Sequence, residues 1–385
     1  MNEYYRDSVL EIDLDIIKNN INNVINKFDD KFIYVVVKGN GYGFGILEIT
    51  QLAIQQGCSG IAVATLDEAF LIRSNFKDIP ILCLGVINKR YLDQCAINDI
   101  TITIPHLNYA KNIWESSLSK QLNVHIKVNT GMNRLGVKNA TEVKQIIAYF
   151  EENNNLNIQG IFTHFATTDL SDQHYEDYFY NQVSYFKQIL ENVNYDFKQI
   201  HCSNSPALLK YNKEIDFCNT IRVGLIISGI YDPAIQDVLN IRSTIKVKSR
   251  ITQISQFSKD EYLGYDNSYQ VENENDYFAI IPIGHADGIT STYSGTLVKS
   301  NNQYGIIVGN ICMDQAIVKF DNEVFIDDDI YIIDNDDEKI NIFAKEKEQG
   351  ITALELVEKF TTRLPKIYYQ DKKIIKIVNP LLDNK

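Results

Sequence analysis

Short apolar runs recur at regular intervals along the first part of the chain. Between about residues 32 and 227, eight runs rich in β-branched residues are separated by polar, helix-compatible sequence. This alternation is typical of parallel strands joined by helical crossovers. The runs are Phe32 to Val37, Gly60 to Ala64, Ile81 to Leu84, Ile100 to Ile104, Val124 to Val128, Ile158 to Thr163, Gln199 to Cys202 and Thr220 to Ile227. We therefore predict a (β/α)₈ barrel, a cofactor-binding domain, over residues 10–238.

An open, doubly wound sheet is the alternative architecture, because the pattern of strands and helices does not show whether a sheet closes. That fold usually carries a G-x-G-x-x-G motif after its first strand. The turn after Val37 reads Lys38 to Gly45 and lacks this motif, which favours the barrel.

The pattern changes after about residue 238, where candidate strands follow one another closely and helical periodicity nearly vanishes. The candidates are Ile245 to Ile254, Tyr277 to Ile283, Gly305 to Ile311, Ala316 to Phe320, Ile330 to Ile333 and Lys372 to Val378, with one helix near Thr352 to Thr361. We predict a mainly-β domain over 239–385, together with 1–9. Two acidic clusters, 327–329 and 334–338, are interpreted as solvated turns, because the ligand spacing of an EF-hand loop is missing.

Length and charge narrow the class of protein. At 385 residues and 44.1 kDa the chain exceeds the size at which single cores stop growing, so two domains are expected. A net charge of -13 argues against nucleic acid or anionic membranes as partners. The sequence shows no signal peptide, no spanning apolar segment and no C-x-x-C pair among its six cysteines. We expect a cytoplasmic protein without a metal or disulfide, which leaves a small-molecule enzyme or a protein-binding scaffold.

Unusual polar residues follow five of the predicted barrel strands. In this fold the active site lies at the carboxyl ends of the strands, so these residues are expected to meet. They are Lys38, Lys127 to Arg134, Thr163 to Ala166, His201 to Ser205 and Arg222 to Gly224.

The loops after strands seven and eight are the frequent phosphate site of a barrel. Ser203, Asn204 and Ser205 with Gly224 supply hydroxyls and backbone donors suited to phosphate. Lys38 is expected on the same ring of strand ends of the barrel. Together these residues indicate pyridoxal phosphate, with its aldehyde bound to the lysine. Each residue also has an ordinary structural interpretation: the serines as helix N-caps, the histidines as core residues, and the lysine as a cation reaching for solvent.

Taken together, the motifs resemble those of the alanine racemase family. The matching segments run in family order and cover nearly the whole chain: Val35 through Gly45, Lys127 through Gly136, Thr163 to Ala166, His201 through Ser205, Arg222 to Gly224, Gly264-Tyr265, Ile283 to Gly288 and Ile311 to Gln315. The resemblance implies a pyridoxal-phosphate-dependent enzyme that interconverts L- and D-alanine and supplies D-alanine for peptidoglycan.

The resemblance also implies roles for individual residues. Lys38 would carry the cofactor and act as one base, and Tyr265 of the other subunit of a head-to-tail homodimer would act as the second. Arg222 would face the pyridine nitrogen, His164 would lie near the catalytic tyrosine, and Lys127 would be a carbamylated lysine that orients Arg134. The cofactor would be held by Tyr42, Asn204, Ser205, Gly224 and Leu225, and the substrate carboxylate by Arg134 and the backbone of Met313.

Departures from the family pattern concern substrate choice above all. His285 and Leu354 stand where the family usually has tyrosines that form the gate to the active site. Asn129, Phe44, Ser228, Gly39 and Gly41 also replace the usual residues. Serine or a longer or basic amino acid is therefore an alternative substrate. A non-catalytic carrier of pyridoxal phosphate is the alternative from another class, although such carriers lack a β-domain.

Overall fold

The computed structural model describes residues 4–168, 172–231 and 239–382, and the chain divides into two compact units. One comprises residues 18–242, and the other comprises residues 1–17 with 243–385. Each unit is described by itself. No helix among the described residues is long and apolar enough to cross a membrane.

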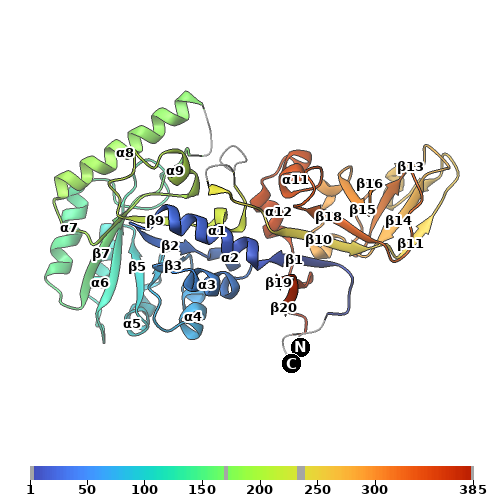
Figure 1. Ribbon diagram of the computed structural model, residues 1–385. Coiled ribbons are helices and arrows are strands. Elements are labelled where there is room, and N and C mark those ends of the chain that lie inside the picture. Colours follow the sequence, from blue (N-terminus) through green and yellow to red (C-terminus); the bar gives the residue numbers. More distant parts are fainter. Residues whose placement is uncertain (1–3, 169–171, 232–238, 383–385) are drawn as a thin grey trace. The chain divides into compact units, whose positions relative to one another are not determined.

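The first unit is built on eight parallel strands with helices outside them (Figure 1). The strands are β2 (Phe32–Val36), β3 (Gly60–Val63), β4 (Ile81–Cys83), β5 (Ile100–Ile104), β6 (Leu122–Lys127), β7 (Leu156–Phe162), β8 (Gln199–His201) and β9 (Thr220–Val223). The order β8-β7-β6-β5-β4-β3-β2-β9 places each strand beside its neighbour in sequence, with β9 beside β2. The predicted fold class is confirmed.

The helices of this unit alternate with its strands. They are α1 (Leu14–Lys27, which begins in the other unit), α2 (Lys38–Tyr42), α3 (Ile46–Gln55), α4 (Leu66–Asn75), η1 (Lys89–Tyr91), α5 (Leu92–Ile97), α6 (Leu107–Trp114), α7 (Ala140–Glu151), α8 (Gln173–Val193), α9 (Ser205–Lys210) and η2 (Leu225–Ser228). Side-chain caps define several starts, such as the capping box of Thr65 and Glu68 on α4. The predicted eighth run, Thr220 to Ile227, is too long: the strand ends at Val223, and residues 225–228 form a 3₁₀ turn.

Side chains bridge the strands at the two ends of this sheet order, β8 and β9. The amide of Ile200 donates to Asn219 Oδ1 at 2.9 Å, and Asn219 Nδ2 donates to the Lys198 carbonyl at 3.0 Å. Further along the same two strands, the amide of Arg222 donates to Ser203 Oγ, just after β8, at 3.1 Å. These contacts join the two edges, and we call them the seam.

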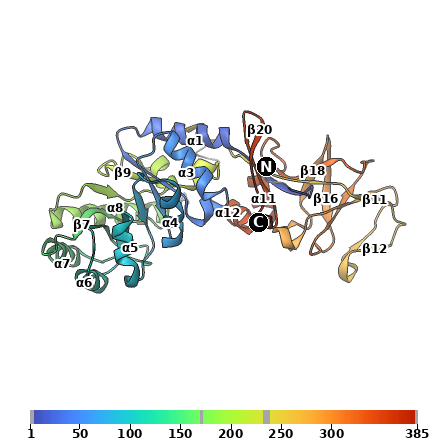
Figure 2. The same cartoon turned by 90° about the horizontal axis from the view of Figure 1, so that it is seen from below.

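The second unit is mainly β. Its ten-stranded sheet has the order β11-β14-β17-β16-β15-β18-β10-β1-β19-β20, and β12 and β13 form a separate ribbon (Figure 2). The strands are β1 (Val9–Asp13), β10 (Ile245–Arg250), β11 (Gln253–Ser255), β12 (Tyr262–Leu263), β13 (Tyr269–Gln270), β14 (Tyr277–Ile281), β15 (Leu297–Ser300), β16 (Gln303–Val308), β17 (Ala316–Phe320), β18 (Asp329–Asp334), β19 (Lys366–Gln370) and β20 (Lys373–Val378).

Short helical segments connect these strands. They are η4 (Tyr265–Asn267), η5 (His285–Asp287), η6 (Ser291–Tyr293), α11 (Ile342–Gln349) and α12 (Ala353–Lys359). The predicted helix near Thr352 is α12, whereas α11 was not predicted. The first strand of the chain, β1, pairs with β10 and β19, so the segment before Lys18 groups with this unit.

Candidate active site

A left-handed turn after β2 carries Lys38. Gly39, Asn40 and Gly41 have φ values of 62°, 54° and 65°, a region that glycine enters without steric cost and asparagine tolerates. The amide of Gly41 donates to the Val37 carbonyl at 2.8 Å and closes the turn. The chain therefore doubles back, and Lys38 Nζ lies 5.8 Å from the centroid of the Tyr42 ring.

Three of the predicted phosphate-binding residues come together beside this turn. A Cβ atom on Gly224 would lie 2.6 Å from the Tyr42 hydroxyl, so only glycine allows this approach. The Gly224 amide donates to Ser205 Oγ at 3.5 Å. Leu225 follows directly and begins η2. Two hydroxyls and a backbone amide thus lie close together, and these are the kinds of group that bind phosphate. We call Tyr42, Ser205 and Gly224 the cradle.

Ser203 and Asn204 directly precede Ser205 of the cradle and make their own hydrogen bonds. Asn204 is the N-cap of α9, and its Oδ1 accepts from the Ala207 amide at 2.9 Å, while its Nδ2 donates to Thr168 Oγ1 at 2.8 Å. Its side chain therefore holds Ser205 in place. Neither serine is an N-cap, because Ser203 Oγ accepts the Arg222 amide.

Arg222 is buried in the barrel and donates to neutral acceptors. Its Nη1 contacts His201 Nδ1, and its Nη2 lies 3.1 Å from the Thr163 carbonyl and 3.2 Å from His164 Nδ1. Burial lowers the pKa of Arg222 to about 10. Among the described residues, no carboxylate forms an ion pair with this guanidinium.

Lys127 ends β6 inside the barrel, with its Nζ 4.6 Å from the centroid of the Phe162 ring. Burial, followed by the charges of Arg222 and Arg134, lowers its pKa well below the ordinary value for lysine. An amine in this environment is largely neutral at pH values where a solvated lysine is charged.

Arg134 is exposed and lies in the loop after β6. The loop is shaped by Asn129, whose Oδ1 accepts from the amides of Gly131 at 3.1 Å and Asn133 at 2.9 Å. At Gly136 a Cβ atom would lie 2.5 Å from the Asn129 nitrogen. This close backbone approach turns the loop so that the Arg134 charge acts on Lys127.

His164 follows β7 and accepts from Arg222 through Nδ1. Burial, followed by the charges of Arg222, Lys127, Arg134 and Lys38, lowers its pKa well below the ordinary value for histidine. It is therefore a neutral imidazole at neutral pH, with its proton on Nε2, because Nδ1 is the acceptor.

Tyr265 and Met313 lie in the other compact unit. Tyr265 opens η4 and is 68% exposed, and Met313 is 62% exposed. Asn310 joins their loops, because its amide donates to Ser268 Oγ at 2.8 Å and its Nδ2 donates to the Tyr265 carbonyl at 3.2 Å. The predicted residues thus form two clusters, one in the barrel and one in the β unit.

The two departures at the expected gate are also in the β unit. His285 is exposed, and its amide donates to the Cys312 carbonyl at 3.0 Å, beside Met313. Leu354 is half-buried in the first turn of α12, which Thr352 caps. The structure therefore places His285 in the neighbourhood of the Met313 loop.

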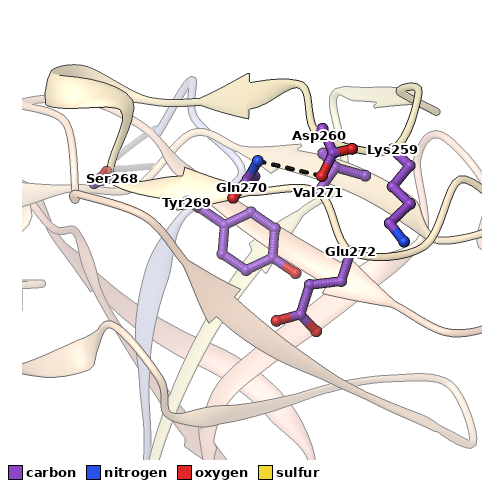
Figure 3. Close-up of a pocket in the computed structure, with 7 residues that line it drawn as sticks. All are labelled: Lys259, Asp260, Ser268, Tyr269, Gln270, Val271 and Glu272. Atoms are coloured by element: carbon purple, nitrogen blue, oxygen red, sulfur yellow. Dashed lines mark hydrogen bonds between the residues drawn. The ribbon is translucent and has the colours of Figure 1, made fainter.

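A pocket over the β12–β13 ribbon contains none of the predicted site residues. It is lined by Lys259, Asp260, Ser268, Tyr269, Gln270, Val271 and Glu272 (Figure 3). Gln270 donates to Asp260 at 3.3 Å across this surface. We assign it no role in the site.

Sequence reasoning missed one residue of the barrel site. His125 lies two residues before Lys127, and alternation along a strand puts both side chains on the same face. Its Nδ1 lies 2.8 Å from His201 Nε2. The two-residue spacing between His125 and Lys127 was the sequence signal that could have identified His125 as a residue of the site.

The geometry defines a barrel protein with a lysine, the cradle and a buried arginine at the ends of its strands. Comparisons with known proteins agree with this class. The chain matches the family models described as alanine racemase, N-terminal domain, over residues 12–232, and alanine racemase, C-terminal domain, over residues 244–368. The chain belongs to the alanine racemase family, as the motifs predicted.

Individual relatives span the chain. An alanine racemase of Halalkalibacterium halodurans is 31% identical and is matched over 99% of this chain and 100% of its own. The crystal structure of alanine racemase from Bacillus anthracis with bound L-Ala-P superimposes with a TM-score of 0.89 at 29% identity, over 99% of this chain and 100% of that one. A histidine racemase from Leuconostoc mesenteroides gives a TM-score of 0.86 at 26% identity, over 96% of this chain and 100% of that one. The chain is thus an isomerase of the racemase type.

Proposed function

We propose that the protein interconverts L- and D-alanine with pyridoxal phosphate as cofactor. The observation that carries this proposal is the approach of the Tyr42 hydroxyl to Gly224, with Ser205 beside them and Lys38 on the same turn. A phosphate and an aldehyde of one cofactor fit these two features together. Family membership supports a cytoplasmic location and a role in supplying D-alanine for peptidoglycan.

Lys38 would bind the cofactor aldehyde, and Tyr42, Ser205, Gly224 and the start of η2 at Leu225 would hold the phosphate. When bound, pyridoxal phosphate makes the α-proton of an amino acid acidic by delocalising negative charge into its ring. Arg222 would face the ring nitrogen. Because its guanidinium can only donate hydrogen bonds, it would favour an unprotonated nitrogen and so a weaker electron sink.

Two bases are needed because racemisation removes a proton from one face of a planar carbon and returns it to the other. Lys38 would serve one face and Tyr265 the other. Their positions in different compact units are compatible with a head-to-tail dimer in which the partner subunit's Tyr265 completes the site. The neutral His164, protonated on Nε2, would donate a hydrogen bond to the oxygen of that hydroxyl.

The substrate carboxylate would be held by Arg134 and the backbone of Met313. Arginine grips carboxylates through paired N–H donors. Lys127 has the lowered pKa of an amine that reacts with carbon dioxide, since only the neutral amine is a nucleophile. Carbamylation would convert it into an anion that orients Arg134.

A racemase of the same family that acts on a larger amino acid is the second candidate. Leu354 and His285 replace residues that the family uses at its gate, and His285 lies beside the Met313 loop. The solved histidine racemase shows that a protein named for another substrate has a similar structure. Serine and basic amino acids are therefore the alternatives to alanine.

A panel of L-amino acids would distinguish these candidates. Purified protein with added pyridoxal phosphate should convert L-alanine into D-alanine faster than it converts serine, histidine or lysine, as measured by chiral chromatography. A Lys38→Ala control should abolish both this conversion and the visible absorbance of the bound cofactor. Preferred turnover of another amino acid would replace the alanine assignment. Cofactor absorbance without turnover would favour the non-catalytic carrier, and the absence of both would contradict both racemase assignments.

A further inference from the structure

A chain of side-chain hydrogen bonds runs through the barrel core behind Arg222. Arg222 Nη1 contacts His201 Nδ1, and His201 Nε2 lies 2.8 Å from His125 Nδ1. The chain ends at His125, whose Nε2 is buried and has no hydrogen-bond partner among the described residues, while the Tyr34 hydroxyl beside it donates to Gln199 Oε1 at 3.0 Å. Each of the five residues is buried.

The direction of each bond follows from the chemistry of the groups. A guanidinium has donors and no acceptor, so His201 Nδ1 accepts. A neutral imidazole has one N–H group, so His201 must carry its proton on Nε2 and donate it to His125 Nδ1. His125 then carries its own proton on Nε2. Arg222 thus sets one tautomer for both rings.

Both imidazole rings are neutral, as this series of hydrogen bonds requires. Burial, followed by the charge of Arg222, lowers the pKa of His201 well below its ordinary value and that of His125 to about 3. The neighbouring charge of Lys127 acts on His201 in the same direction. A second proton on either ring would remove the acceptor that the next residue needs.

Stacking alone does not fix the His201 ring. His201 lies flat against Phe162, with ring centroids 4.7 Å apart and an interplanar angle of 3°. A half-turn of the imidazole about its Cβ–Cγ bond keeps this plane and this stacking, but it places carbon atoms against Arg222. The hydrogen bonds at the two edges of the ring are what distinguish the two orientations.

We propose that His125 is a positioning residue for the reaction: its Nδ1 accepts a hydrogen bond from the Nε2–H group of His201 and thereby keeps Nδ1 of His201 aimed at Arg222. The catalytic part of this inference rests on the proposed function, in which Arg222 faces the cofactor ring. The structural part, one orientation and one tautomer of His201, does not.

The structural part is tested by nitrogen-15 NMR of the holoenzyme labelled at its histidines. The wild-type protein should show His125 and His201 as neutral rings protonated at Nε2 near pH 8. A His201 signal protonated at Nδ1, or at both nitrogens, would overturn the inference without any variant.

Three variants test the role of His125. His125→Leu removes the acceptor, and the His201 Nε2 proton signal should shift and exchange faster with solvent. His125→Asn keeps an acceptor near the position of Nδ1 and should restore the wild-type signal. Tyr34→Phe is the matched control, because it deletes a buried polar group of the same core and leaves the His125–His201 bond intact. An unchanged His201 signal in His125→Leu would overturn the inference.

Kinetics test the consequence for Arg222. His125→Leu should lower kcat about tenfold or more with little change in KM, because Arg222 is not proposed to bind substrate. His125→Asn should recover most of kcat. Equal losses in His125→Leu and Tyr34→Phe would indicate a general core defect and contradict the positioning role. If the wild-type protein had no racemase activity, the NMR result would still stand, so the two failures are distinguishable.

Discussion

The Tyr42 hydroxyl occupies the space that a side chain at position 224 would need. A Cβ atom on Gly224 would lie 2.6 Å from that hydroxyl, and the Gly224 amide points to Ser205. The left-handed turn after Lys38 makes this approach, since it reverses the chain within four residues. The lysine and the cradle are consequently parts of one local structure.

Gly224→Ala should weaken cofactor binding rather than unfold the protein. The added methyl group meets the free end of a side chain, so Tyr42 is displaced. Loss of its hydrogen bond should cost about 1 kcal/mol, or roughly a fivefold higher dissociation constant for pyridoxal phosphate, measured by titration of the apoprotein.

The double variant Tyr42→Phe/Gly224→Ala provides the control. Both single variants lose the hydrogen bond of the same hydroxyl, and Tyr42→Phe also removes the nearest of the three contacts at 2.6, 2.9 and 3.0 Å, so the two changes should be less than additive. Strictly additive effects would show that the two residues act independently and would contradict the cradle.

The seam predicts a stability effect for Asn219. Asn219→Ala removes the acceptor of the Ile200 amide and the donor to the Lys198 carbonyl. We expect a loss of about 1–2 kcal/mol in the free energy of unfolding, measured by urea denaturation. Asn157→Ala is the matched control, because Asn157 donates only to the Asn123 side chain on β6, which backbone pairing already joins to β7. If the seam does not stabilise the barrel, both variants should show the same small loss in the free energy of unfolding.

The alternation of apolar runs predicted the barrel well, because eight buried parallel strands each need a β-branched segment. This pattern did not predict which strands pair when the two strands are far apart in the sequence. The strands β1 and β19 pair with each other across more than 350 residues, and no local pattern reports such pairing. Helix α11 was missed because Lys345 lies on its buried face, where a polar residue breaks the periodicity. Its ammonium is satisfied by the Leu297 carbonyl and Glu348.

The sequence predicted that polar residues meet at the ends of the barrel strands, but it did not predict the contacts that each of them makes. An apolar run does not distinguish a buried strand from a buried helical turn, so the end of β9 at Val223 was missed. Serine after a strand suggested an N-cap, whereas Asn204 takes that place. His125 on β6 contacts His201 on β8, which is not a neighbouring strand. This contact depends on how the sheet curves, which the local sequence does not report.

The buried histidines predict a loss of stability on acidification. The pKa values of His125, His164 and His201 are lowered in the folded protein, His125 to about 3. The unfolded chain takes up protons below about pH 6.5 while the folded protein does not. The free energy of unfolding should therefore fall as pH drops from 7 to 5, by at most about 1.4 kcal/mol per pH unit for each histidine.

Urea denaturation at several pH values measures this dependence. In His125→Asn, the slope of the free energy of unfolding against pH should be smaller by the contribution of one histidine. A slope that is unchanged in this variant would mean that His125 is not neutral in the folded state.

The lowered pKa of Lys127 predicts carbamylation. With the neutral amine available inside the barrel, incubation with carbon-13 bicarbonate should give a carbamate signal in carbon-13 NMR. The signal should be lost in Lys127→Ala and retained in Arg134→Ala. Its absence from the wild-type protein at neutral pH would contradict the proposed orientation of Arg134 by an anion.

The two-base assignment is tested most directly by Tyr265→Phe in deuterated water. This variant keeps Lys38, so it should exchange the α-proton of one alanine enantiomer for deuterium and leave the other enantiomer unexchanged. Conversion between the enantiomers should fall by orders of magnitude while cofactor absorbance is retained. Proton NMR and chiral chromatography together report both quantities. Racemisation at the wild-type rate, or exchange of both enantiomers, would contradict the account.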